Sequence, residues 1–356
     1  MGRTVLTAAL PMHPLGNTDL KITRLGFGAW AVGGGNWSFG WGPQEDADSI
    51  AAIRHAISRG VNWIDTAAIY GIGHSEEVVA EALREVPRAD RPLIFTKCGL
   101  IADPKRPMDP AQRVGDPKSI RREVEASLRR LEVERIDLYQ MHWPAEDGTP
   151  VEEYWQAMLD LKAEGKVRAV GLSNHNAAQL ARAEALGHVD SLQPPFSAIR
   201  RDAAADDIPW CRSHATGVIV YSPMQSGLLT GAFSEERARN LAPADWRRRS
   251  ADFTGEGLKR NLKLAEALKG VAKVHETTVA AVAVAWTLAW PGVTGAIVGA
   301  RSPQQVDGWI GAATLELTDS DMAEIATAIE KTGAGSGPTM PEHHVRTGRP
   351  IPTAVE

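Results

Sequence analysis

The sequence predicts an α/β fold, a (β/α)8 TIM barrel in a single domain, with long loops at the C-terminal face of the barrel and an extra C-terminal helix. Short apolar runs typical of buried strands alternate with amphipathic helices along nearly the whole chain of 356 residues, which favours a parallel sheet. Eight such strand–helix units indicate a closed barrel, which needs about 250 residues plus insertions and therefore fits this length.

The first half of the chain begins with a small hairpin or bottom cap over 19–24, followed by the first strand at 25–28. The glycine run 33–35 prevents a helix from starting directly after this strand. We therefore interpret the stretch as a long loop and not as a dinucleotide-binding turn, which must open into a helix. The next strands are predicted at 61–64, 93–96 and 136–141.

Capping residues mark where several helices begin. Ser75 and Asp116 are expected to cap the helices that follow the second and third strands, and residues 149–152 read as a capping box for the next helix. Thr318 is expected to cap the extra C-terminal helix.

The second half of the chain repeats the strand–helix alternation. Strands are predicted at 167–172, 190–193, 218–221 and 295–298, and helices at 258–274, at 279–288 and from 302 onward. We divide the chain into an N-terminal arm over 1–20, the barrel over 21–332 and a Gly- and Pro-rich tail over 333–356.

Composition limits the classes of function. The net charge of −5 gives no indication of binding to nucleic acid or to an anionic membrane. No apolar stretch approaches the roughly 18 residues of a membrane span. Cys98 and Cys211 are the only cysteines and lie in no metal or redox spacing, which indicates a reducing, cytoplasmic compartment. No metal site is predicted.

Four polar residues fall at or beside the ends of three successive strands. Asp65 ends the second strand and Tyr70 follows in the loop, while Lys97 and His142 end the next two strands. A buried carboxylate needs a partner, and a Tyr with an ordinary pKa near 10 needs a nearby cation to act as an acid at neutral pH. Each residue alone has a simpler structural interpretation, but the four together predict general acid catalysis.

This pattern, with the motif around Asp65 to Tyr70, resembles the aldo-keto reductase family, in particular its bacterial NADP-dependent members. The resemblance implies that Tyr70 protonates the oxygen of a carbonyl substrate during hydride transfer. It also implies that Lys97, held by Asp65, lowers the pKa of Tyr70 and that His142 orients the carbonyl.

The same resemblance implies a site for NADPH or NADP+. Its nicotinamide end corresponds to Ser173, Asn174, Gln193 and Tyr221, and its pyrophosphate loop includes Ser222, Pro223, Gly227 and Leu228. Gly299, Arg301 and Gln305 correspond to the adenosine 2′-phosphate site, and the Arg is the reason to expect NADP. Ala232 and Trp309 depart from the basic residue and the Asn that many members have at these places.

The resulting prediction is NADPH-dependent reduction of a small aldehyde or ketone, with a sugar or sugar-derived aldehyde as one possibility. Trp30, Trp37 and Trp143 are candidate substrate contacts because they lie in presumed loops. Two alternatives stay open: an NAD(P)-dependent sugar or cyclitol dehydrogenase, and a cofactor-sensing binding subunit of the same fold. The oligomeric state also stays open. The basic run 247–249 is either a contact for a cofactor or substrate phosphate or a solvated turn, and we favour the solvated turn.

Overall fold

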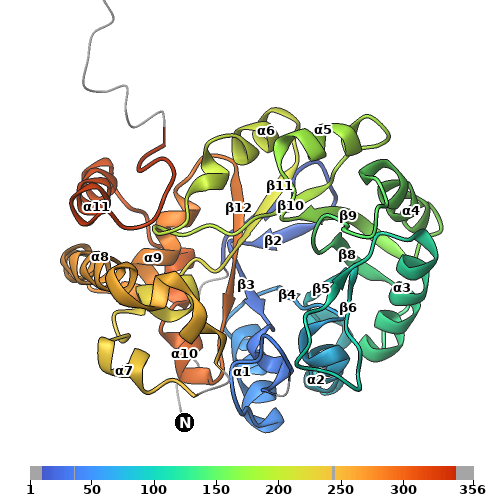
Figure 1. Cartoon of the computed structure of the whole chain (residues 1–356), viewed down its shortest axis with the longest axis horizontal. Coiled ribbons are helices and arrows are strands. Elements are labelled where there is room, and N and C mark those ends of the chain that lie inside the picture. Colours follow the sequence, from blue (N-terminus) through green and yellow to red (C-terminus); the bar gives the residue numbers. More distant parts are fainter. Residues whose placement is uncertain (1–9, 36, 243–244, 342–356) are drawn as a thin grey trace, which may run out of the picture.

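The computed structural model describes residues 10–35, 37–242 and 245–341. Eight parallel strands close into a barrel in the order β10-β11-β12-β3-β4-β5-β8-β9, and helices surround it (Figure 1). The predicted barrel is therefore confirmed. Its strands are β3 (Leu25–Gly28), β4 (Trp63–Asp65), β5 (Leu93–Cys98), β8 (Ile136–Met141), β9 (Val167–Ser173), β10 (Ser191–Gln193), β11 (Gly217–Tyr221) and β12 (Val293–Gly299).

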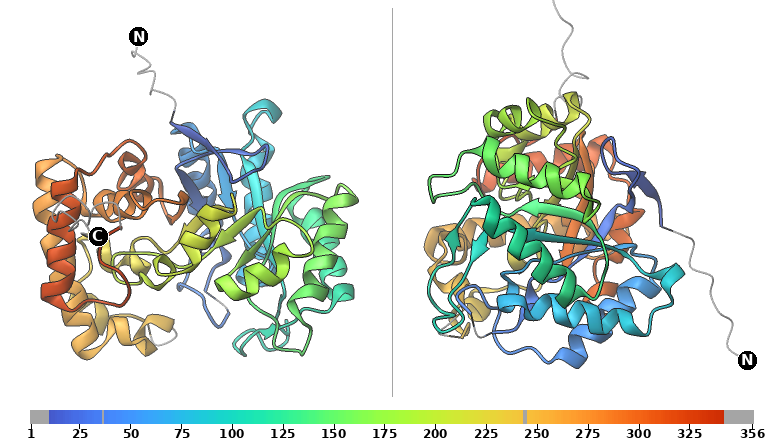
Figure 2. Two further views of the ribbon diagram at one scale, coloured as in Figure 1. Left: turned by 90° about the horizontal axis from the view of Figure 1, so that it is seen from above. Right: turned by 90° about the vertical axis from the view of Figure 1, so that its right-hand side faces the viewer.

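The helices bury apolar side chains against the outside of the barrel. The predicted extra C-terminal helix is α11, which packs against α8 at one edge of the molecule (Figure 2). The helices are α1 (Asp46–Ser58), α2 (His74–Arg84), α3 (Pro117–Leu131), α4 (Val151–Ala163), α5 (Ala177–Glu184), α6 (Asp207–Ser213), α7 (Glu235–Arg239), α8 (Gly255–Val274), α9 (Val279–Leu288), α10 (Pro303–Asp307) and α11 (Asp319–Thr332).

A hairpin closes the amino-terminal end of the barrel. Strand β1 (Met12–Pro14) pairs antiparallel with β2 (Lys21–Thr23), which confirms the predicted bottom cap. Between them Leu15 and Leu20 are fully buried in the cluster that fills the inside of the barrel. The boundary that we drew after residue 20 lies within this hairpin. The division of the chain into arm, barrel and tail stays a prediction.

Two of the four predicted caps are confirmed. The Asp116 carboxylate accepts hydrogen bonds from two main-chain N–H groups at the start of α3. Thr318 and Asp321 form a capping box at α11. Both arrangements satisfy N–H groups that have no partner within the helix.

The other two capping predictions are wrong. Ser75 lies inside the first turn of α2, where its hydroxyl donates to the Ala29 carbonyl at 2.9 Å and joins the loop after β3 to this helix. At α4 the N-cap is Pro150, without a side-chain cap. The preceding Thr149 N–H donates instead to Asp147 at 3.0 Å, so the turn before the helix uses an acid outside the predicted motif.

Two long loops extend over the carboxyl ends of the strands. The first carries a two-stranded flap that the sequence did not predict, β6 (Leu100–Ile101) with β7 (Gln112–Arg113). The second follows β11 and contains short 3-10 turns and α7. None of the helices in the described ranges has the length and apolar character needed to cross a membrane.

Candidate active site

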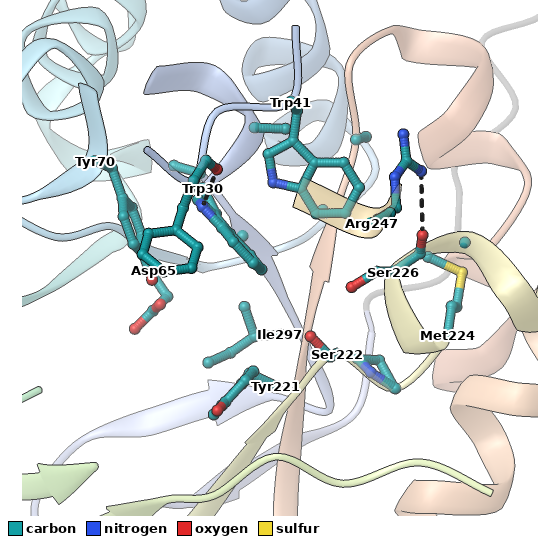
Figure 3. Close-up of a pocket in the computed structure, with 18 of the residues that line it drawn as sticks. Trp30, Trp41, Asp65, Tyr70, Tyr221, Ser222, Met224, Ser226, Arg247 and Ile297 are labelled. Atoms are coloured by element: carbon teal, nitrogen blue, oxygen red, sulfur yellow. Dashed lines mark hydrogen bonds between the residues drawn. The ribbon is translucent and has the colours of Figure 1, made fainter. Parts of the chain in front are cut away.

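A cavity of about 820 Å³ opens at the carboxyl ends of the barrel strands. Tyr70 and Asp65 lie at one end and Arg247 at the other (Figure 3). Almost every predicted site residue lines it: Trp30, Trp37, Asp65, Tyr70, His142, Trp143, Ser173, Asn174, Gln193, Tyr221, Ser222, Pro223, Gly227, Gly299, Arg301 and Gln305. The exceptions are Lys97, which is buried with Asp65, and Leu228, whose fully buried side chain packs in the core.

Strand alternation places the polar residues inside the barrel. Side chains two residues apart on a strand point to the same face, so an apolar layer is followed by a polar one. The apolar layer contains Trp63, Phe95 and Leu138 from β4, β5 and β8. Two residues further along the same strands come Asp65, Lys97 and Gln140.

The Asp65–Lys97 pair is the buried centre of the site. The Lys97 ammonium lies 2.5 Å from Asp65 Oδ1 and also donates to the Thr66 carbonyl at 2.8 Å. The two side chains are 3% and 0% exposed. From this position Lys97 Nζ reaches Tyr70 Oη at 3.4 Å. The phenol at the floor of the cavity therefore has a cation behind it.

The effect on the pKa of Tyr70 differs from the sequence-based prediction. Burial and the negative charge of Asp65 raise the pKa of Tyr70 well above its ordinary value, whereas we expected Lys97 to lower it. Burial also lowers the pKa of Lys97, although Asp65 opposes this shift. In this arrangement Tyr70 is a protonated phenol at neutral pH, which is the form that can donate a proton.

His142 lies beside Tyr70 as a neutral imidazole. The two rings meet edge to face with their centres 5.7 Å apart, and His142 is 8% exposed. Burial, together with the charge of Lys97, lowers the pKa of His142 well below its ordinary value. A neutral imidazole offers one N–H donor and one acceptor, which suits a hydrogen bond to a carbonyl oxygen.

Two glutamines complete the buried network around Asp65. We did not predict the contact that Gln193 makes with this carboxylate. Gln193, expected at the nicotinamide carboxamide, donates from Nε2 to Asp65 Oδ2 at 2.9 Å. Gln140 donates to the same oxygen at 3.4 Å. We missed Gln140, although its position two residues before His142, on the same face of the chain, was a usable signal.

The expected nicotinamide residues form one connected group. Tyr221 Oη donates to Asn174 Oδ1 at 2.8 Å, and Asn174 Nδ2 donates to the His142 carbonyl at 2.9 Å. The Ser173 hydroxyl donates to the Gln193 carbonyl at 2.9 Å. Asn174 has a φ of 62°, a left-handed conformation that Asn tolerates better than most residues. The group is thus held in place by bonds between β9, β10 and β11.

Aromatic rings join the two ends of the cavity. Trp30 stacks on Trp246 at 5.8 Å between ring centres and on Tyr70 at 6.3 Å. Trp41 meets the edge of Trp30 at 5.1 Å (Figure 3). The loop after β3 therefore packs directly against the loop after β11.

Arg247 corrects the interpretation of residues 247–249 as a solvated turn. Its side chain is 9% exposed and forms two hydrogen bonds to Asp245, at 3.0 and 2.7 Å. Its guanidinium lies 4.9 Å from the ring centre of Trp41 and donates to the Ser226 carbonyl at 3.4 Å. Arg248 and Arg249 are exposed, so the earlier interpretation holds for them alone.

Arg301 lines the cavity but is not a free cation. Its Nε donates to Gln44 Oε1 at 2.6 Å, and its Nη1 donates to the Trp41 carbonyl at 3.3 Å. Nη2 donates to the Pro43 carbonyl. Burial, with contributions from Arg247 and Arg237, lowers the pKa of Arg301.

The sequence model of the aldo/keto reductase family matches residues 24–330. This chain belongs to the aldo/keto reductase family. The resemblance seen in the sequence is thereby confirmed, and the protein is an oxidoreductase of a family that uses nicotinamide cofactors.

Several relatives of this aldo/keto reductase match over nearly their full length. An NADH-specific methylglyoxal reductase of Escherichia coli (strain K12) is 34% identical, over 89% of this chain and 99% of the relative. Aldo-keto reductase YhdN of Bacillus subtilis (strain 168) is 33% identical, over 92% and 96%. The structure of the glycerol dehydrogenase AKR11B4 from Gluconobacter oxydans matches with a TM-score of 0.81 and 32% identity, over 92% of this chain and 97% of that one.

The far end of the cavity in this aldo/keto reductase fits the phosphates of a dinucleotide. Arg237, Arg247 and Arg301 line it, and like charges gathered in one cavity favour an anion. The indole N–H groups of Trp41 and Trp309, which also line the cavity, are buried without a hydrogen-bond partner in the described part of the chain. Such orphaned donors are typical of a site that an acceptor fills.

A buried Tyr–His pair next to Ser173 in this aldo/keto reductase was missed by sequence reasoning. Tyr154 Oη lies 2.7 Å from His175 Nε2, and His175 Nδ1 lies 2.8 Å from the Ser173 carbonyl. Burial lowers the pKa of His175 to about 4, so the ring is neutral. A His directly after Ser173 and Asn174 was the available signal.

We expect His175→Phe to lower the free energy of unfolding by about 1–3 kcal/mol, because it leaves the Tyr154 hydroxyl buried without a partner. The double variant with Tyr154→Phe should cost less than the sum of the single variants, since the unpaired hydroxyl is then removed as well. Urea unfolding measures both effects. Additive costs would show that the two side chains do not act as a pair.

Proposed function

We propose that this protein reduces a small aldehyde or ketone to the alcohol with NADPH, with Tyr70 as the general acid. The observation that carries the proposal is the phenol of Tyr70 at the cavity floor, 3.4 Å from the ammonium of the buried Lys97–Asp65 pair. An acid, a cation behind it and a neutral His142 beside it form the set that protonation of a carbonyl oxygen needs.

The chain's own residues supply positioning and the proton. The bound dinucleotide supplies the hydride. Ser173, Asn174 and Gln193 would hold its carboxamide, and Tyr221 would lie against its ring. Tyr70 gives the proton from Oη to the carbonyl oxygen as negative charge develops there. Lys97 stabilises the phenolate that remains, because a positive charge favours the ionised form of a neighbouring acid.

The residues that line the cavity near Tyr70 favour the proposal of a small substrate. Trp30, Trp37 and Trp143 line the cavity, and the rings of Trp30 and Trp37 lie 6.3 and 6.1 Å from the ring of Tyr70. The E. coli relative is named a methylglyoxal reductase, which is in keeping with a small carbonyl compound. A sugar-derived aldehyde is the larger candidate, and the tryptophans offer flat faces for it.

A second candidate is oxidation of a polyol by the same site in the reverse direction. The structural match to a glycerol dehydrogenase favours it. Oxidation of NADPH and NADH over a panel of aldehydes, ketones and sugars, and reduction of NADP+ and NAD+ over the corresponding alcohols, separate the two directions. Absence of turnover in both directions, with cofactor bound, would contradict the enzymatic proposal and favour a cofactor-sensing subunit.

We expect Arg301→Ala to weaken NADPH binding by about tenfold or more and NADH binding far less, because only NADPH carries a 2′-phosphate for a guanidinium to bind. Dissociation constants from isothermal titration calorimetry test this. Arg301→Lys serves as the control, since it keeps the charge without the two-pronged geometry. Equal weakening of both cofactors would contradict a role at the 2′-phosphate.

A further inference from the structure

The guanidinium of Arg301 already contacts the loop after β3 through three of its nitrogens. Nε donates to Gln44 Oε1 at 2.6 Å, Nη1 to the Trp41 carbonyl at 3.3 Å and Nη2 to the Pro43 carbonyl. Gln44 returns a bond from Nε2 to the Arg301 carbonyl at 3.2 Å and donates to Ser49 Oγ at 3.0 Å. Residues 41–44 thus hold Arg301 through both its guanidinium and its main-chain carbonyl.

This arrangement bears on how Arg301 could bind a phosphate. A guanidinium has five N–H groups, and the strongest contact with a phosphate uses two parallel ones. Three of the five N–H groups of Arg301, one on each nitrogen, already donate to segment 41–44. A 2′-phosphate that takes up a two-pronged contact through Nε and a neighbouring Nη therefore has to displace part of that segment.

We infer that segment 41–44 competes with the 2′-phosphate of NADPH for Arg301, and that Gln44 is a determinant of the choice between NADPH and NADH. The inference rests on the proposed function, since it takes the adenosine end of the cofactor to lie at Arg301. NADH carries a neutral hydroxyl at this position, which has no charge with which to displace the segment. It is therefore bound with the segment in place.

The relative strengths of the hydrogen bonds determine whether segment 41–44 or the phosphate holds Arg301. Segment 41–44 offers Arg301 only neutral acceptors, one side-chain amide and two main-chain carbonyls. A phosphate forms charge-assisted hydrogen bonds that are roughly twice as strong. The phosphate of NADPH therefore displaces the segment from Arg301. The apparent affinity for NADPH is still reduced, because in a fraction of the molecules the segment holds Arg301 before the cofactor binds. Loosening the segment removes that reduction.

Gln44→Ala tests the inference because it removes the side-chain acceptor of the segment and leaves Arg301 in place. We expect NADPH to bind about fivefold tighter or more, and NADH to change by less than about twofold. Gln304→Ala is the matched control, since Gln304 is an exposed residue on α10 that does not line the cavity. It should leave both dissociation constants unchanged. Titration calorimetry of the wild type and both variants with NADPH and with NADH gives the six dissociation constants without a substrate.

Gln44→Glu provides the opposite test. Its carboxylate would pair with Arg301 by charge-assisted hydrogen bonds, so NADPH should bind about tenfold more weakly while NADH stays unchanged. Weaker NADPH binding by Gln44→Ala, or equal shifts for both cofactors, would overturn the inference, because the segment would then support the site. A wild-type protein that binds NADH but not NADPH overturns it as well, and leaves carbonyl reduction standing. If neither cofactor binds, the proposed function fails too.

Discussion

Replacement of Tyr70 by Phe is expected to lower kcat for carbonyl reduction by about 10²- to 10⁴-fold, the usual contribution of a positioned general acid. Only the hydroxyl is lost, so the ring that packs on Trp30 and Trp37 stays in place. The dissociation constant of NADPH should therefore be unchanged. Single-turnover reduction and cofactor titration measure the two quantities separately.

Tyr139→Phe is the matched control, because Tyr139 is a fully buried tyrosine that does not line the cavity. It should keep the wild-type rate. The raised pKa of Tyr70 adds a pH test. Since the phenol loses its proton only above its ordinary range, kcat for reduction should not fall between about pH 7 and pH 9. A Tyr70→Phe variant with the wild-type rate would show that another group donates the proton.

The fold and the grouping of Asp65, Tyr70, Lys97 and His142 were predictable because both depend on order along the chain. Asp65, Lys97 and His142 each stand at the end of an apolar run, and parallel strands bring their carboxyl ends to one rim. Grouping these three residues with Tyr70 needed no knowledge of long-range packing. The same reasoning could have added Gln140, which lies two residues before His142 and therefore points to the same side.

Contacts between loops were not predictable in this way. Arg301 was expected to be free for a phosphate, yet it contacts Gln44, which lies more than 250 positions away in the sequence. Arg247 was read as solvated and is buried on Trp41. In both cases a positive charge and an apolar or amide partner meet only because the loops after β3, β11 and β12 converge. Neither local periodicity nor residue type specifies that convergence.

The pKa of Tyr70 shifts in the direction opposite to the prediction, and the reason is similar. The sequence indicated a cation beside the phenol, and Lys97 is there. It did not indicate that the phenol itself is buried and that the charge of Asp65 offsets that of Lys97, so that burial dominates the pKa of Tyr70. The cation helps the phenolate only once the proton has begun to leave.

Lys97→Met is expected to lower the free energy of unfolding by about 3–5 kcal/mol, the usual cost of leaving one member of a buried ion pair without its partner. Asp65 is 2% exposed, and without the ammonium it keeps only hydrogen bonds from the amides of Gln193 and Gln140. The kcat for reduction should also fall strongly, since the phenolate of Tyr70 loses its cation. Urea unfolding and steady-state turnover measure the two effects.

The double variant Asp65→Asn/Lys97→Met separates stability from catalysis. Removing both charges leaves no buried ion unpaired, so most of the lost free energy of unfolding should return, because replacing a whole buried pair is often close to neutral. Turnover should not return, because the cation behind Tyr70 is still absent. Recovery of turnover together with stability would mean that Lys97 only holds the fold. Failure to recover stability would mean that Lys97 contributes through its bond to the Thr66 carbonyl and its packing, and not through its charge pair with Asp65.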